Sequence, residues 1–228
     1  MNKLTILWDG RLYCPSIAAF INASVQIATF IVVIFIIGIP AITDVNKFID
    51  LATHNPFPIL IEDLLKFLSA ALTCVLIWVF YQNLHSSRPK LMFLANVFGF
   101  LSVLCLVTNA TLSFYTILQA ASYTQATDEL GNQLNTSIGV LGVGAIFFNG
   151  VWYLLVSWSA LKNEKLPKLF SYLGLGIGIV SLIPLLGIFV LVLSVIWSIW
   201  LGLLLLKQKP TAIPKRLNAR FVFGLLVL

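Results

Sequence analysis

SYLGLGIGIVSLIPLL, residues 171–186, contains three closely spaced glycines and no charged residue. Two structures suit such a stretch: a glycine-rich loop that cradles phosphate groups, or a membrane helix with a smooth packing face. A dinucleotide-binding loop needs the spacing Gly-x-Gly-x-x-Gly between a strand and a helix, with an acidic residue downstream. Gly174, Gly176 and Gly178 instead follow Gly-x-Gly-x-Gly inside an apolar run. The stretch therefore predicts a membrane helix on which Gly174, Gly178 and Ser181 form a contact face for another helix.

The composition of the whole chain indicates the same environment. Of its 228 residues, 60% are apolar and 10% are charged, and the mean hydropathy is +1.00. Soluble domains carry about 25% charged residues, so this chain has too little polar surface to cover a water-soluble globule. We expect an all-α integral membrane protein whose main surroundings are the lipid bilayer. The net charge of +6 does not indicate nucleic-acid binding, because the basic residues lie at the ends of apolar runs.

Uncharged intervals define the membrane spans, because a helix crosses the roughly 30 Å hydrocarbon core in about 20 residues. The last interval, 169–206, has 38 residues and would reach about 57 Å as one helix. Pro184 and Gly187 near its middle therefore predict a hairpin of two spans, and five spans with a re-entrant hairpin is the alternative. The predicted spans are residues 17–38, 67–84, 91–118, 138–161, 169–183 and 188–206.

The distribution of charge supports six transmembrane helices with both the N- and C-termini cytoplasmic. This topology places twelve of the 14 basic residues inside, as the positive-inside rule requires. The outside keeps only Lys47 and Lys66 among the basic residues, together with six acidic residues. With one span fewer, the basic tail at residues 207–228 would lie outside and the pattern would be lost.

Segments outside the spans have their own patterns. Residues 44–54 carry apolar side chains on one helical face, which predicts an amphipathic helix on the outer membrane surface. Glu62 and Asp63 are expected to open the second long helix, with Lys66 in a favourable i,i+4 pair with Glu62. Trp197, in the last span, is expected to pack against a neighbouring helix.

Other small and polar residues lie inside the predicted spans. Gly139 and Gly142, in the stretch GVLGVG, predict a second helix-packing face. Asn22, Gln26 and Asn149 are amides within the bilayer. Such amides usually hydrogen-bond to other helices, and the alternative is an intramembrane polar pocket for a small neutral ligand.

Catalytic and metal-binding patterns are absent from the sequence. The predicted topology places the carboxylates in loops or at helix ends, which leaves no acid pair within the membrane. His54 is predicted outside and His85 inside, so the two cannot share a metal ion or a haem. We expect no metal, no cofactor and no catalytic residue, and hence a protein that is not an enzyme.

The second half of the chain resembles the domain-of-unknown-function 4386 family of six-span, mostly bacterial membrane proteins, mainly over residues 165–207. The residues that carry this resemblance are LPKLFSYLGLGIGIVSL, with its Leu-Pro loop and glycine-bearing span, and GIFVLVLSVIWSIWLGLLLLK, with its tryptophans and terminal lysine. The resemblance implies a six-helix fold, and it brings no activity or catalytic residue.

Three functions are compatible with these features. The first is a non-enzymatic accessory, assembly or structural subunit that acts through helix packing, with a membrane protein partner or a second copy of the chain. The second is a small-molecule transporter or channel that uses the amides at positions 22, 26 and 149. A lipid enzyme ranks last because the sequence contains no acid, base and nucleophile cluster. The expected location is the bacterial inner membrane, with the thylakoid membrane as an alternative.

Overall fold

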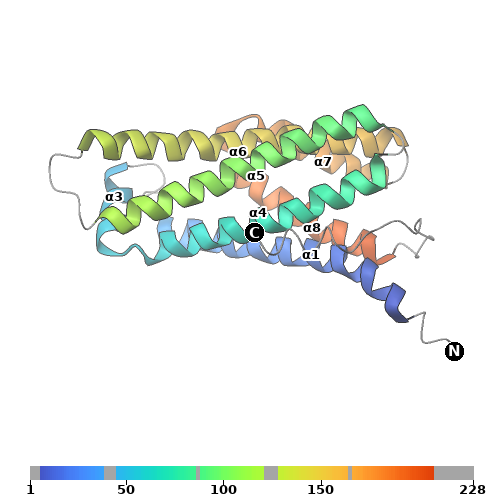
Figure 1. The fold of residues 1–228 in the computed structure, drawn as a ribbon, viewed down its shortest axis with the longest axis horizontal. Coiled ribbons are helices and arrows are strands. Elements are labelled where there is room, and N and C mark those ends of the chain that lie inside the picture. Colours follow the sequence, from blue (N-terminus) through green and yellow to red (C-terminus); the bar gives the residue numbers. More distant parts are fainter. Residues whose placement is uncertain (1–5, 39–44, 86–87, 121–127, 164–165, 208–228) are drawn as a thin grey trace.

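The structure is a computed structural model that describes residues 6–38, 45–85, 88–120, 128–163 and 166–207. Every regular element in these ranges is helical, and the long helices run along one common direction (Figure 1). In chain order they are α1 (Ile6–Ile31), η1 (Val32–Gly38), α3 (Val45–His54), α4 (Phe57–Leu84), α5 (Pro89–Ala120), α6 (Asp128–Asn163), α7 (Lys168–Ser181), η3 (Pro184–Leu186) and α8 (Gly187–Lys207).

Six of these helices form a closed ring. α4 packs between α1 and α5, α6 packs between α5 and α7, and α8 completes the ring by packing against both α7 and α1. Helices that short connections join are neighbours in the ring, and α1 packs against α4 although η1 and α3 lie between them in the chain. The contact between α1 and α8 joins the first and last helices of the described chain, so the bundle depends on pairing that is distant in sequence.

The two ends of the bundle differ in structure. The connections from α4 to α5 and from α6 to α7 lie at one end, together with the carboxyl end of α8 (Figure 1). The opposite end carries α3, the carboxyl end of α5 and the start of α6 (Figure 1). Figure 1 shows α3 lying across the direction of the long helices, and α3 also contacts α5. The segment predicted as amphipathic is therefore a helix at one end of the bundle.

α7 and α8 form a hairpin with arms of unequal length. Within the described ranges, five helical segments are long and apolar enough to cross a membrane. α7 is a shorter apolar helix of 14 residues, about 21 Å long. The chain turns through the 3₁₀ segment Pro184–Leu186 and re-enters a helix at Gly187. A Cβ placed on Gly187 would lie 3.5 Å from the Ile146 side chain. The tip of the hairpin thus lies beside a middle part of α6.

Three helices begin about ten residues before the predicted spans. The first span was expected from residue 17 and α1 begins at Ile6. The second span was expected from residue 67 and α4 begins at Phe57; the fourth was expected from residue 138 and α6 begins at Asp128. Uncharged intervals locate the part of a helix that suits lipid, whereas hydrogen bonding continues the helix into polar sequence. Pro58 in the first turn of α4 favours this early start, because proline there sacrifices no helical hydrogen bond.

Aromatic side chains fill the middle of the ring. Trp197 of α8 is 1% exposed and stacks with Phe80 of α4 and Phe170 of α7, at centroid distances of 5.5 and 5.0 Å. Trp152 and Tyr153 of α6 meet it edge-on, at 6.1 and 5.0 Å. Rings in these geometries attract one another beyond simple burial. The expectation that Trp197 packs against a neighbouring helix is confirmed.

Candidate functional site

The glycines of the opening stretch lie in a tight seam between α6 and α7. A Cβ on Gly178 would lie 2.5 Å from Leu154 Cγ and 2.8 Å from the Gly150 carbonyl oxygen, both on α6. A Cβ on Gly150 would in turn lie 2.5 Å from the Cβ of Ser181. Such distances are too short for carbon atoms in contact, so only glycine permits this approach of the two backbones.

Gly174 lies where α6, α7 and α8 meet. A Cβ there would collide with the Ser157 hydroxyl of α6 and lie 3.1 Å from the indole nitrogen of Trp197 on α8. The face that carries Gly174, Gly178 and Ser181 is buried. It therefore packs against helices of the same chain.

The two glycines predicted on α6 have different surroundings. A Cβ on Gly142 would make an ordinary contact of 3.4 Å with the amide nitrogen of Asn109 on α5. A Cβ on Gly139 would have no atom within 4 Å among the described residues. Gly142 thus faces α5, whereas Gly139 faces away from the other described helices.

Of the three amides predicted to form an intramembrane polar pocket, two lie between α1 and α8. Asn22 is buried and its amide nitrogen donates to the Ser198 hydroxyl at 3.2 Å. The Ser194 hydroxyl can donate to Gln26 Oε1, also 3.2 Å away. Asn149 lies half-buried on α6, whose neighbours in the ring are α5 and α7. The bonds of Asn22 and Gln26 join two helices, and a pocket shared with Asn149 stays a prediction.

A charged cluster lies near the start of α4. The ammonium nitrogen of Lys66 is 3.1 Å from Glu62 Oε1 and 3.1 Å from Asp63 Oδ1. The Glu62 and Lys66 side chains are each 18% exposed, and that of Asp63 is fully buried. Residues three and four apart share one face of a helix, so a single lysine can contact both carboxylates. The expected pair of Glu62 with Lys66 is confirmed; Asp63, expected in a loop or at a helix end, lies inside the helix and the core.

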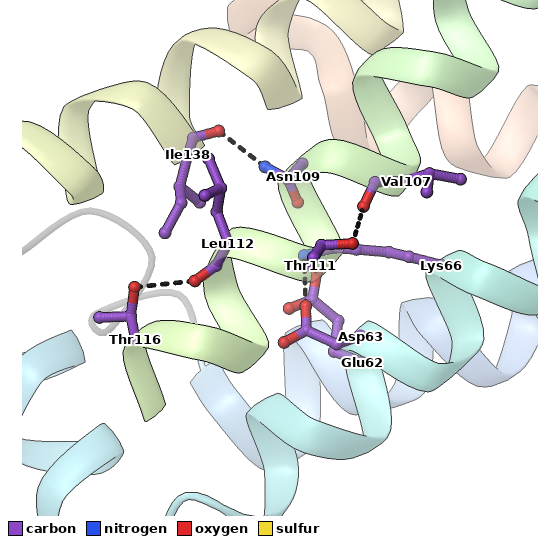
Figure 2. A network of polar contacts seen from close by, with 9 residues as sticks. All are labelled: Glu62, Asp63, Lys66, Val107, Asn109, Thr111, Leu112, Thr116 and Ile138. Carbon is purple, nitrogen blue, oxygen red and sulfur yellow. Dashed lines mark hydrogen bonds and ion pairs between the residues drawn. The ribbon is translucent and has the colours of Figure 1, made fainter. Parts of the chain in front are cut away.

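Polar side chains of α5 face this cluster. Ser113 interacts with the Asp63 carboxylate, and Asn109 lies one helical turn away on the same side of α5. Asn109 is 4% exposed, and its amide nitrogen donates to the Ile138 carbonyl oxygen of α6 at 2.6 Å (Figure 2). The cluster therefore involves α4 and α5 directly, and Asn109 links it to α6.

The cluster as a whole was not predicted from the sequence. The spacing predicted a favourable i,i+4 pair of Glu62 with Lys66 at the start of the second long helix, and it gave Asp63 no partner. A signal was present nevertheless: Asn109 and Ser113 are spaced i,i+4 in the uncharged third span, and such a polar stripe requires a polar partner on a neighbouring helix. Which helix would supply that partner was not readable from spacing, since it depends on the order of the ring.

The charged cluster offers several groups that can bind an ion or a polar molecule. No group of three or more histidine, cysteine, aspartate or glutamate side chains within the described ranges could hold a metal ion. The cluster contains two carboxylates and one ammonium group on the same helix face, together with amide and hydroxyl groups. Carboxylate, carbonyl and hydroxyl oxygens bind hard cations and hydrogen-bond donors.

Long apolar helices in a closed ring, with charges at their ends, define a multi-pass helical membrane protein. Residues 25–209 match a family described as Domain of unknown function (DUF4386), and the chain belongs to that family. The match reaches from α1 to the end of α8, well beyond residues 165–207, on which the resemblance in sequence depended. Comparison with curated proteins found no match. Comparison with solved structures likewise found no match.

Proposed function

We propose that the protein has six spans, with α7 and α8 as the last two, and that both termini are cytoplasmic. Support comes from the charges of the described helix ends. Near the α4–α5 and α6–α7 connections and the end of α8, the described charged residues are all basic: Arg88, Lys90, Lys162, Lys168 and Lys207. The described acidic residues outside α1 belong to the opposite end. This separation matches the positive-inside rule and suits a bacterial inner membrane.

We infer that the protein is a non-enzymatic accessory or assembly subunit that binds a transmembrane helix of another membrane protein. The single observation that carries this proposal is the incomplete cover of α6. The α7–α8 hairpin ends beside Ile146, so the part of α6 before that residue lacks the neighbour that its later part has.

The uncovered part of α6 has the surface that helix association requires. Val140 and Val143 are 65% and 45% exposed, and Gly139 has open space where a side chain would stand. Membrane helices associate through small residues that let backbones approach, because burial of apolar surface gives little driving force in lipid. Gly174 and Gly178 already contact helices of the same chain, so on the uncovered part of α6 Gly139 is the glycine open to a partner.

The alternative function, a small-molecule transporter or channel that uses neutral amides, has less support. Asn22 and Gln26 have hydrogen-bond partners on α8, as expected of side chains that hold helices together.

The test uses the native protein extracted gently from its own membrane and analysed by native mass measurement and cross-linking. We expect a complex with a second membrane protein, and we expect Gly139→Leu to weaken it. Gly176→Leu is the matched control, because Gly176 also has no atom within 4 Å of its Cβ position but lies on α7. A monodisperse monomer without a partner, or equal complexes in both variants, would refute the proposal. A complex that contains only copies of this chain would identify a homo-oligomer instead.

A further inference from the structure

The charged cluster of α4 is not neutral in itself. At their ordinary ionisation, Glu62, Asp63 and Lys66 together carry one net negative charge, and Lys66 contacts both carboxylates through a single ammonium group. The Lys66 ammonium group donates a hydrogen bond to Asp63 Oδ1. The other carboxylate oxygen, Oδ2, is buried without a hydrogen-bond partner among the described residues. A buried charge that lacks full compensation is strongly unfavourable.

A second unpartnered oxygen belongs to the neighbouring helix. Asn109 Oδ1 is also buried without a partner within the described chain, although the nitrogen of the same amide is bound to Ile138. That bond fixes the amide, so its oxygen cannot exchange places with the nitrogen without losing a 2.6 Å hydrogen bond. Figure 2 shows the oxygen of Asn109 directed toward the end of the Lys66 side chain rather than toward Ile138.

The antiparallel packing of α4 and α5 brings these groups to one level of the bundle. Ser113 lies beside Asp63, and α4 and α5 run in opposite directions. The residue one turn before Ser113 on α5, Asn109, therefore has the same depth as Lys66, one turn after Asp63 on α4. Two oxygens that can only accept hydrogen bonds or coordinate a cation thus lie about one helical turn apart along the bundle.

We propose that Asp63 Oδ2 and Asn109 Oδ1, with the Ser113 hydroxyl, bind one small monovalent metal cation. One positive charge neutralises the cluster, whereas a divalent ion would leave an excess positive charge in a low-dielectric site. Oxygen ligands suit hard cations. The cluster lies near the outer end of α4 in the proposed topology, and the partial exposure of Glu62 provides a route from the external solution.

The experiment measures thermal unfolding of the full chain in detergent as NaCl, KCl or choline chloride is varied at constant ionic strength and pH. Binding to the folded state raises its stability with ligand concentration. We expect the Tm to rise with the logarithm of the Na⁺ or K⁺ concentration once this exceeds the dissociation constant, by about 3–6 °C at ten times the dissociation constant. Choline, which is too large for the site, should leave the Tm unchanged.

Three variants locate the effect. Asp63→Asn keeps the shape of the side chain and should abolish the cation-dependent rise. Ser113→Ala, a milder change that keeps the fold if Asp63→Asn does not, should move the start of the Tm rise to several-fold higher cation concentration. Asp50→Asn is the matched control, because it removes the same charge from an exposed side chain of α3, and it should respond as the parent does.

Two results would overturn the proposal. A Tm that depends on ionic strength alone, and not on which cation is present, would exclude a specific site. A Tm that rises only as the pH falls, equally in all three salts, would show that a proton on Asp63 compensates the charge instead of a metal cation. Because Gly139 is not involved, neither result bears on the binding of a membrane partner.

Discussion

Replacing Gly178 by alanine adds one methyl group at a tight point of the α6–α7 seam. The added carbon would lie 2.5 Å from Leu154 Cγ and 2.8 Å from the Gly150 carbonyl oxygen. The leucine can rotate away, but a backbone oxygen cannot, so the two helices must separate by several tenths of an ångström. A gap of about 0.5–1 Å removes a quarter to a half of each dispersion contact across the seam, and overpacking of this kind costs about 1–3 kcal/mol.

Gly176→Ala is the matched control, since it makes the same chemical change two residues away on the same helix. Its Cβ has no atom within 4 Å among the described residues. Both variants gain up to about 1 kcal/mol of helix propensity over glycine. The difference between their unfolding free energies therefore measures the cost of the added methyl group in the α6–α7 seam. We expect Gly178→Ala to be about 1–3 kcal/mol less stable than Gly176→Ala, measured by reversible unfolding in mild detergent with tryptophan fluorescence. Equal stability of the two variants would refute the close contact of α6 and α7 at Gly178.

The opposite side of the seam provides a rescue experiment. Gly150→Ala should destabilise the protein in the same way, because its Cβ would lie 2.5 Å from the Cβ of Ser181. Ser181→Gly removes that carbon, so the double variant should recover part of the loss. In a double-mutant cycle, this recovery is the coupling between contacting residues, which reaches about 0.5–3 kcal/mol. Additive effects of the two substitutions would mean that the positions do not touch.

Three further perturbations test other parts of the structure. A reporter that is active only in the cytoplasm should be active after Asn163 and silent after Asp128; activity after Asp128 would contradict the six-span topology. Asn22→Leu should cost about 1 kcal/mol or less in unfolding free energy, as expected for an amide that joins α1 to α8, and a much larger loss would mean that the side chain does more than bond to Ser198. Lys66→Met should lower the unfolding free energy by about 3–5 kcal/mol, because it leaves the buried Asp63 carboxylate without the ammonium group that contacts it. A variant as stable as the parent in the same unfolding assay would show that water or another group compensates the charge.

The helix ends differ from the span ends that the amino-acid sequence predicts. The apolar intervals predicted where lipid surrounds each helix, since transfer of a side chain into hydrocarbon depends on the side chain itself. They did not predict that α4 and α6 extend into polar sequence, because a helix continues wherever its backbone hydrogen bonds are maintained and its neighbours support it. α5 continues beside α4 at this end of the bundle, and α6 continues beside α5 (Figure 1). The extension of α4 carries the charged cluster.

The lipid environment, the family and the residues suited to close packing follow from the amino-acid sequence alone, because hydropathy, charge placement and the absence of a side chain are local properties. What those residues contact follows from the fold. Gly178 meets α6 of its own chain while Gly139 faces away from the described helices, and a face of a helix cannot reveal its partner until the order of helices is known. Asp63 became a buried charge for the same reason: its burial depends on α5, whose Ser113 is distant in sequence and adjacent in space.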